Sequence, residues 1–227
     1  MSITPTALTR TAGIAAIASG ALFVAVQIGH PTLDAAFATT TEYFVREYAK
    51  VAMALLGLIG ITGMYLRQVR QSGVLGLIGG SVFAAGFLSI LTITVISVTI
   101  LPTVAGFAPG YVDSVLAGLG GGTSTADIGA LSTLSTVGGL AYMLGGLVFG
   151  IALFRANVLA RWAAVVLSAG TIATVLLAML PDFNDRLLAI PTGIAMIGLG
   201  YSLFTRASDA AAPVAVMANV LDAPVAR

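Results

Sequence analysis

Long apolar stretches recur along this chain, and each is long enough to form a helix that crosses a membrane. About 20 helical residues span the roughly 30 Å of hydrocarbon in a bilayer. Six such stretches occur, and they lie near residues 11–29, 47–66, 73–101, 128–154, 162–180 and 187–205. The sequence therefore predicts an all-α fold, a polytopic membrane bundle of six transmembrane helices.

The composition supports this interpretation and limits the possible partners. Hydrophobic residues make up 58% of the 227 residues and charged residues only 8%, whereas soluble domains contain about a quarter charged residues. We therefore expect an integral membrane protein whose first partner is the lipid bilayer. The net charge of +1 provides no field that would attract nucleic acid, so we expect no nucleic-acid partner.

The basic residues predict the orientation of the spans. If the N-terminus is inside, the inner ends hold Arg10, Arg67, Arg70, Arg155, Arg161, Arg206 and Arg227, and the outer ends hold only Arg46, Lys50 and Arg186. Basic residues favour the cytoplasmic side, so we expect both termini in the cytoplasm. The first apolar stretch also has features of a cleaved signal peptide, but it is longer than a usual signal core, and we interpret it as the first span.

An internal repeat suggests how the spans are paired. RTAGIAAIASGALFVA from Arg10 aligns without gaps on RQSGVLGLIGGSVFAA from Arg70, and RWAAVVLSAGTIA from Arg161 is a weaker third copy. Each copy is followed by a proline, at Pro31, Pro102 or Pro181, which we expect to stop the helix. The sequence thus predicts three tandem hairpins in one transmembrane domain, residues 1–206, followed by an alanine-rich tail at 207–227 that we expect to be disordered.

Two further segments of the chain have a predicted local structure. Apolar residues at helical spacing over 110–119 predict a short surface helix in the 102–127 outer loop. This segment either forms a lid over an outward cavity or contributes a helix that packs on the bundle. Pro191 is expected to kink the last span near the carbonyl of Leu187. The glycines within the spans predict close helix packing.

The segment TEYFVREYAK, residues 41–50, holds the densest group of charges. Thr39 and Glu42 have the spacing of a capping box, so the second helix is predicted to begin in water. Val51 to Leu66 rises only about 24 Å at 1.5 Å per residue, which is too short for the hydrocarbon core. Glu47 and Lys50 therefore either reach up to the interface or face protein inside the outer leaflet.

In the second case these charges belong to a polar pocket at the outer face. The other polar residues near the same ends of the spans complete the candidate pocket, which comprises His30, Asp34, Arg46, Glu47, Lys50, Asp182, Asp185 and Arg186. If Glu47 and Lys50 instead reach up to the interface, these residues form only the polar rim of the bundle.

Missing residue types exclude most chemistry. The chain has no cysteine and a single histidine, so we expect no metal site and no cofactor. No carboxylate lies in the central third of a predicted span, and no hydrolase or nucleotide-binding motif occurs. We therefore name no catalytic residue.

Four segments carry a resemblance to a known group. GITGMYLRQVRQSGVLGL (60–77), APGYVDSVLAG (108–118), GIALFRANVLARWAA (150–164) and IPTGIAMIGLGYSLF (190–204) resemble small six-span integral membrane proteins of high-GC Gram-positive (actinobacterial) bacteria. The resemblance implies the topology and a location in the bacterial plasma membrane, and it implies no activity or site residue.

Three functional hypotheses remain from the sequence. The first is a non-enzymatic scaffold or accessory subunit that contacts other membrane proteins. The alternative is a binder or transporter of a lipid or small amphiphile through the outer-leaflet polar pocket. The third is a membrane enzyme in which His30, Glu47 or Asp185 acts as an acid or base.

Overall fold

The computed structural model describes residues 4–29, 31–119, 122–178 and 189–207, and the side chains of 174–178 are excluded. Seven α-helices and one 3₁₀ turn make up this part of the chain, and it contains no strand. The elements are α1 (Pro5–Ala25), η1 (Phe37–Thr39), α2 (Thr41–Arg67), α3 (Val69–Ala105), α4 (Pro109–Leu119), α5 (Ala130–Ala156), α6 (Arg161–Ala178) and α7 (Ile190–Thr205). The alanine-rich tail lies outside the described residues from Ser208 onward.

Helix length separates the helices into two groups. Among the described residues, α1, α2, α3 and α5 are long and apolar enough to cross a membrane, whereas the apolar segments described in α6 and α7 are shorter. The prediction of an all-helical bundle of membrane character is confirmed to this extent.

The start of α2 corrects one local prediction. The N-cap is Thr40 and not Thr39, because the Thr40 hydroxyl accepts a hydrogen bond from the N–H of Tyr43 at 3.2 Å. Thr39 belongs to the preceding 3₁₀ turn, where its hydroxyl donates to the carbonyl of Ala36. The helix start predicted in this segment is therefore a 3₁₀ turn followed by a helix that Thr40 caps.

Two prolines behave differently from the sequence prediction. Pro102 was expected to stop a helix, but it lies inside α3, which continues to Ala105. Pro191 lies in the first turn of α7, where a missing N–H breaks no hydrogen bond, so it starts a helix instead of kinking one. Leu187, the expected position of the kink, lies outside the described residues.

A glycine sets the connection between α2 and α3. The backbone of Gly73 has φ 55° and ψ −147°, which interrupts the helical geometry near the start of α3. This region of backbone space is open almost only to glycine. Gly73 therefore lets α3 turn back along α2 within a few residues.

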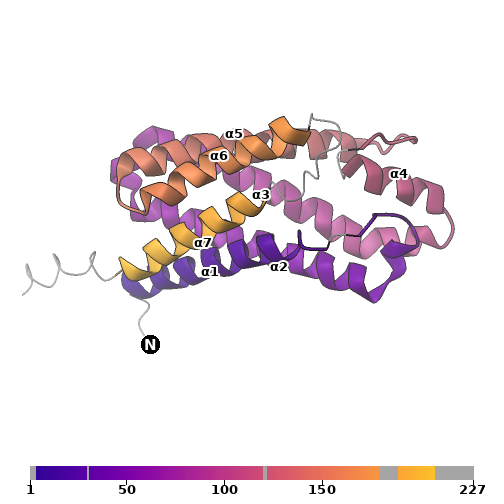
Figure 1. Ribbon diagram of the computed structural model, residues 1–227, viewed down its shortest axis with the longest axis horizontal. Helices are drawn as coiled ribbons and strands as arrows, with labels where there is room; N and C mark the ends of the chain where they lie inside the picture. The colour runs from indigo at the N-terminus through magenta and orange to yellow at the C-terminus, as the bar shows by residue number, and fades with distance from the viewer. Residues whose placement is uncertain (1–3, 30, 120–121, 179–188, 208–227) are drawn as a thin grey trace, which may run out of the picture.

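The long helices pack antiparallel to their neighbours in sequence (Figure 1). A Cβ atom on Gly60 of α2 would lie 2.8 Å from that of Ala16 in α1, and one on Gly63 would lie 2.2 Å from that of Ala12. Residue numbers thus rise along one helix as they fall along the other. In the order α1, α2, α3, α5, α6 and α7, each helix packs against the next. Because α7 also packs against α1, these helices form a closed ring.

Glycines form the two most extensive contacts of this ring. In the contact between α1 and α7, Gly13 lies against Gly200 and Gly20 lies against Gly193. In the contact between α3 and α5, a Cβ on Gly145 would lie 2.2 Å from the backbone nitrogen of Phe83. These helices approach backbone to backbone, as small residues permit in lipid.

The apolar core is divided into two clusters. The larger one fills the ring and includes the buried rings of Phe23, Phe83, Phe87, Tyr142 and Phe149. The smaller one lies at the end of the bundle that carries α4 (Figure 1), and it combines Tyr43 of α2 with Leu101 of α3 and Val112, Val115 and Leu116 of α4. The helix predicted at 110–119 is present as α4, and its apolar face packs on the bundle.

Candidate functional site

The candidate site lies at the start of α2, where the charges of residues 41–50 fall on two different faces of the helix. Glu42 and Arg46 occupy one face and are joined by an ion pair of 2.8 Å between Oε1 and Nε. Glu47 and Lys50 form the second pair, with 2.5 Å between Oε1 and Nζ. The two pairs have different surroundings and different roles.

Arg46 closes the C-terminal end of α1. Its Nη2 donates to the carbonyl of Gly29 at 2.9 Å, and its Nη1 lies 3.3 Å from the carbonyl of Ile28 and 3.4 Å from that of Val26. Carbonyls at a helix C-terminus have no partner within the helix and carry partial negative charge, so a cation stabilises them. Arg46 therefore has a structural explanation.

Glu47 faces protein. Only 5% of this residue is exposed, while the side chain of Lys50 is 22% exposed. The reason is its position on the helix, because the buried residues 43, 47, 54, 57, 61 and 64 recur at intervals of three, four and seven and lie on one face of α2. This spacing was visible in the sequence, and it was the signal that would have predicted the burial of Glu47.

The pair belongs to a polar layer between the two apolar clusters. Tyr43, one turn above Glu47, belongs to the smaller cluster, and Met53 and Ala54, below it, belong to the larger. On the facing helix α3, Thr94 and Ser97 are buried at the same level, between Leu91 and Leu101. The hydroxyl of Tyr43 donates to the carbonyl of Ser97 at 3.1 Å and fixes α2 against α3 there.

Two acidic residues at the end of the bundle that carries α4 bind backbone groups. Asp34 accepts a hydrogen bond from the N–H of Phe37 at 2.7 Å and so caps the 3₁₀ turn η1. Asp113 of α4 accepts one from the N–H of Ala35, also at 2.7 Å, which ties α4 to the segment after α1. These carboxylates hold together the end of the bundle that carries α4.

The structure thus brings some predicted site residues together and separates others. Glu47 and Lys50 are paired and face the bundle, whereas Arg46 and Asp34 bind other groups. The remaining members of the predicted pocket, His30, Asp182, Asp185 and Arg186, lie outside the described residues. Among the residues that are described, no three His, Asp or Glu side chains are close enough to hold a metal ion.

Two buried hydroxyls within the ring were missed by the sequence analysis. The hydroxyls of Tyr142 on α5 and Thr192 on α7 are both buried, and neither makes a well-oriented hydrogen bond in the described part of the chain. Buried polar groups are normally paired. Tyr142 belongs to the packed aromatic cluster inside the ring of helices.

Three cavities formed by described residues lie between neighbouring elements of the bundle. One of about 350 Å³ lies between α5 and α6, and one of about 660 Å³ lies between α1 and α2. A third, of about 510 Å³, is lined mainly by serine and threonine residues where the segment after α4 meets α5. Neither Glu47 nor Lys50 lines any of the three.

Comparison with protein-family models, with curated proteins and with solved structures finds no match to this chain.

Proposed function

We propose that this chain is a non-enzymatic, six-span protein of the bacterial plasma membrane, with both termini in the cytoplasm, that acts as a scaffold or accessory subunit of a membrane complex. The antiparallel order of α1, α2, α3, α5, α6 and α7 supports three tandem hairpins. The basic residues support the orientation, because Arg10, Arg67 and Arg206 lie at the same end of the bundle, near the end of α7.

The observation that carries this proposal is the filled interior of the ring. Phe83, Phe87 and Phe149 have no exposed surface, and Phe23 and Tyr142 are each only 6% exposed. Ring centroids lie 5.1 Å apart for Phe83 and Phe87 and 5.5 Å apart for Phe83 and Tyr142. A transporter needs a binding site at the centre of its bundle, and packed aromatic rings occupy that position here.

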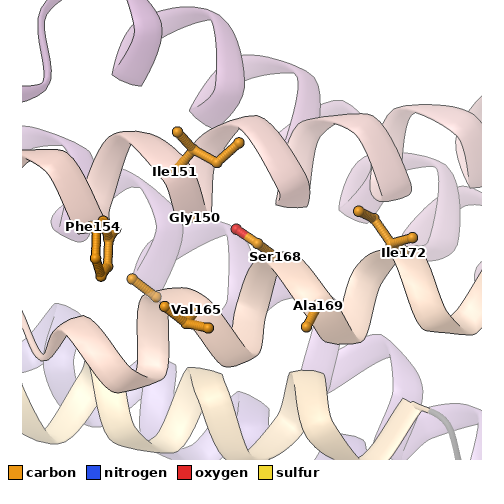
Figure 2. A pocket seen from close by; sticks show the side chains of 8 residues that line it. Gly150, Ile151, Phe154, Val165, Ser168, Ala169 and Ile172 are labelled. Atoms are coloured by element: carbon orange, nitrogen blue, oxygen red, sulfur yellow. The ribbon is translucent and has the colours of Figure 1, made fainter.

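The outer surface of the bundle offers a groove for a partner helix. Figure 2 shows it between α5 and α6, with Ile151 and Phe154 on one side and Val165 and Ala169 on the other. Its lining is apolar, because the hydroxyl of Ser168 already donates to the carbonyl of Leu147. A transmembrane helix with small residues fits such a groove, since helices in lipid associate by close packing.

Filling this groove is expected to release the partner. Val165 lies in the groove and is 51% exposed, and Val137 lies elsewhere on the outer surface of α5 and is 58% exposed. Extracted in mild detergent from its native membrane, the parent chain should migrate as a complex with another protein. Val165→Trp should reduce the recovered complex at least about tenfold, the effect of losing about 1.4 kcal/mol of contact energy, and Val137→Trp should leave it intact.

Native mass spectrometry of the same extracts decides the result. A parent chain that migrates alone, or only with a second copy of itself, would contradict an accessory role. Equal loss of the complex in both tryptophan variants would place the partner somewhere other than this groove.

A second candidate function is favoured by the polar layer in the outer half of the bundle. Glu47 and Lys50, together with the buried Thr94 and Ser97, place polar groups where a lipid or small amphiphile from the outer leaflet would need them. This function requires the ligand to open a path to the pair.

The double variant Glu47→Gln with Lys50→Met tests this second candidate. If the pair binds a lipid headgroup, the amount of lipid that co-purifies with the protein should fall to half or less, as measured by mass spectrometry of extracted lipid. Glu42→Gln is the matched control, because it removes an exposed charge from the same helix. Unchanged lipid content in the double variant would exclude the pair as a binding site.

A further inference from the structure

The largest of the three cavities lies far from the predicted outer pocket, at the arginine-rich end of the bundle. It is a groove between α1 and α2, lined by Leu8 and Ala12 on α1 and by Leu58, Ile59, Gly63 and Arg67 on α2. Its floor is closed, because α1 and α2 touch where Ala12 meets Gly63. Its walls remain open to the outside, since Leu8 is 61% exposed and Ile59 is 48% exposed.

The polar side chains that line this groove have hydrogen-bond partners, with one exception. The hydroxyls of Thr9 and Thr62 donate to the carbonyls of Pro5 and Leu58 in their own helices. Arg67 is different, because its Nε is buried and has no hydrogen-bond partner among the described residues. Its Nη2 reaches only the carbonyl of Arg206, at 3.4 Å.

The charge of Arg67 is also unpaired within the described part of the chain. The ion pairs found there are Glu42 with Arg46 and Glu47 with Lys50, and both lie at the other end of α2. A guanidinium group keeps its proton in proteins, so this charge cannot be removed by deprotonation. An anionic group that enters the groove would therefore meet a positive charge that no acidic side chain in the described part of the chain neutralises.

The shape of the groove defines the rest of the ligand. Arg67 is the last residue of α2, where a membrane helix reaches the level of the lipid headgroups. From Arg67 to Leu58 the groove follows α2 for nine residues, about 14 Å at 1.5 Å per residue, with apolar walls. The first turn of α1 contains no acidic residue that would repel an anion at the mouth of the groove.

We propose that the groove between α1 and α2 binds an anionic phospholipid. The phosphate accepts hydrogen bonds from Arg67, and one acyl chain lies along Leu8, Ala12, Leu58 and Ile59. Arginine suits this role because its planar guanidinium donates two parallel hydrogen bonds to a phosphate. The site is separate from the partner groove between α5 and α6.

Lipid titration of the purified protein tests the proposal. In native mass spectrometry, phosphatidylglycerol should bind the parent chain about tenfold more tightly than phosphatidylcholine with the same acyl chains, because both lipids carry the same phosphodiester but the choline cation repels the charge of Arg67. Arg67→Gln should lose this preference. Arg70→Gln is the matched control, because Arg70 is exposed, lies three residues further along the chain and does not line the groove.

Two further variants separate the possible outcomes. Ile59→Trp fills the apolar part of the groove and should weaken phosphatidylglycerol binding while Arg67 is intact. Val165→Trp fills the other groove and should leave the lipid preference unchanged. Equal binding of the two lipids by the parent, or equal loss of preference in Arg67→Gln and Arg70→Gln, would overturn the proposal. Unfolding midpoints of the variants show whether each remains folded.

Discussion

Gly145→Ala is expected to destabilise the bundle by about 3 kcal/mol, the upper part of the range for an overpacked core. The added Cβ would lie 2.2 Å from the backbone nitrogen of Phe83 and 2.5 Å from its Cα. Backbone atoms cannot rotate away as the end of a side chain does, so α3 and α5 must move apart. That movement would also separate Phe83 from Tyr142 in the aromatic cluster.

Gly139→Ala is the matched control on the same helix. A Cβ at Gly139 would meet nothing within 4 Å, so the change should be neutral or should stabilise α5 by up to about 1 kcal/mol through helix propensity. The free energy of unfolding in mixed detergent micelles measures both variants. Equal stability of the two would mean that α3 and α5 do not pack through Gly145.

Lys50→Met is expected to cost about 3 kcal/mol, because it leaves the buried carboxylate of Glu47 without its cation. Glu47→Gln should cost less, since the side chain of Lys50 is 22% exposed and can extend its ammonium group to the interface, whereas that of Glu47 is only 7% exposed. The double variant should recover to within about 1 kcal/mol of the parent, because neither buried charge remains. A double-mutant cycle of unfolding free energies measures the coupling.

The exposed pair on the same helix provides the comparison. Glu42 is 56% exposed, so Glu42→Gln should cost at most about 1 kcal/mol. Additive losses in the double variant of Glu47 and Lys50 would contradict the assignment of these residues to one buried pair. A Lys50→Met variant as stable as the parent would show that Glu47 finds another partner or reaches water.

The candidate site was predictable in part. Its position at the start of α2 and the pairing of Glu42 with Arg46 followed from helical spacing. The interaction of Arg46 with Gly29 did not, because it depends on where the C-terminal end of α1 lies relative to α2. Burial of Glu47 was also predictable, because the buried positions of α2 recur at helical spacing through residue 47. Which helix this face meets does not follow from the spacing.

The prolines show the limit of local rules. Proline lacks an N–H group, but the effect of this loss depends on where the proline lies in the helix. Pro191 lies in the first turn of α7, whereas α3 continues past Pro102 to Ala105. Helix boundaries therefore depended on tertiary packing around the proline.

The sequence by itself determined that this is an all-helical bundle with membrane-length apolar helices, because hydrophobicity and charge act residue by residue and add up along a segment. It also located α4 from the spacing of its apolar side chains. Only the tertiary structure decided which groups remain unpaired. Arg67 is a single arginine among several in the sequence, and its buried Nε and adjoining groove arise only where α1, α2 and α7 meet. Pairing depends on distances between helices, which a residue pattern does not contain.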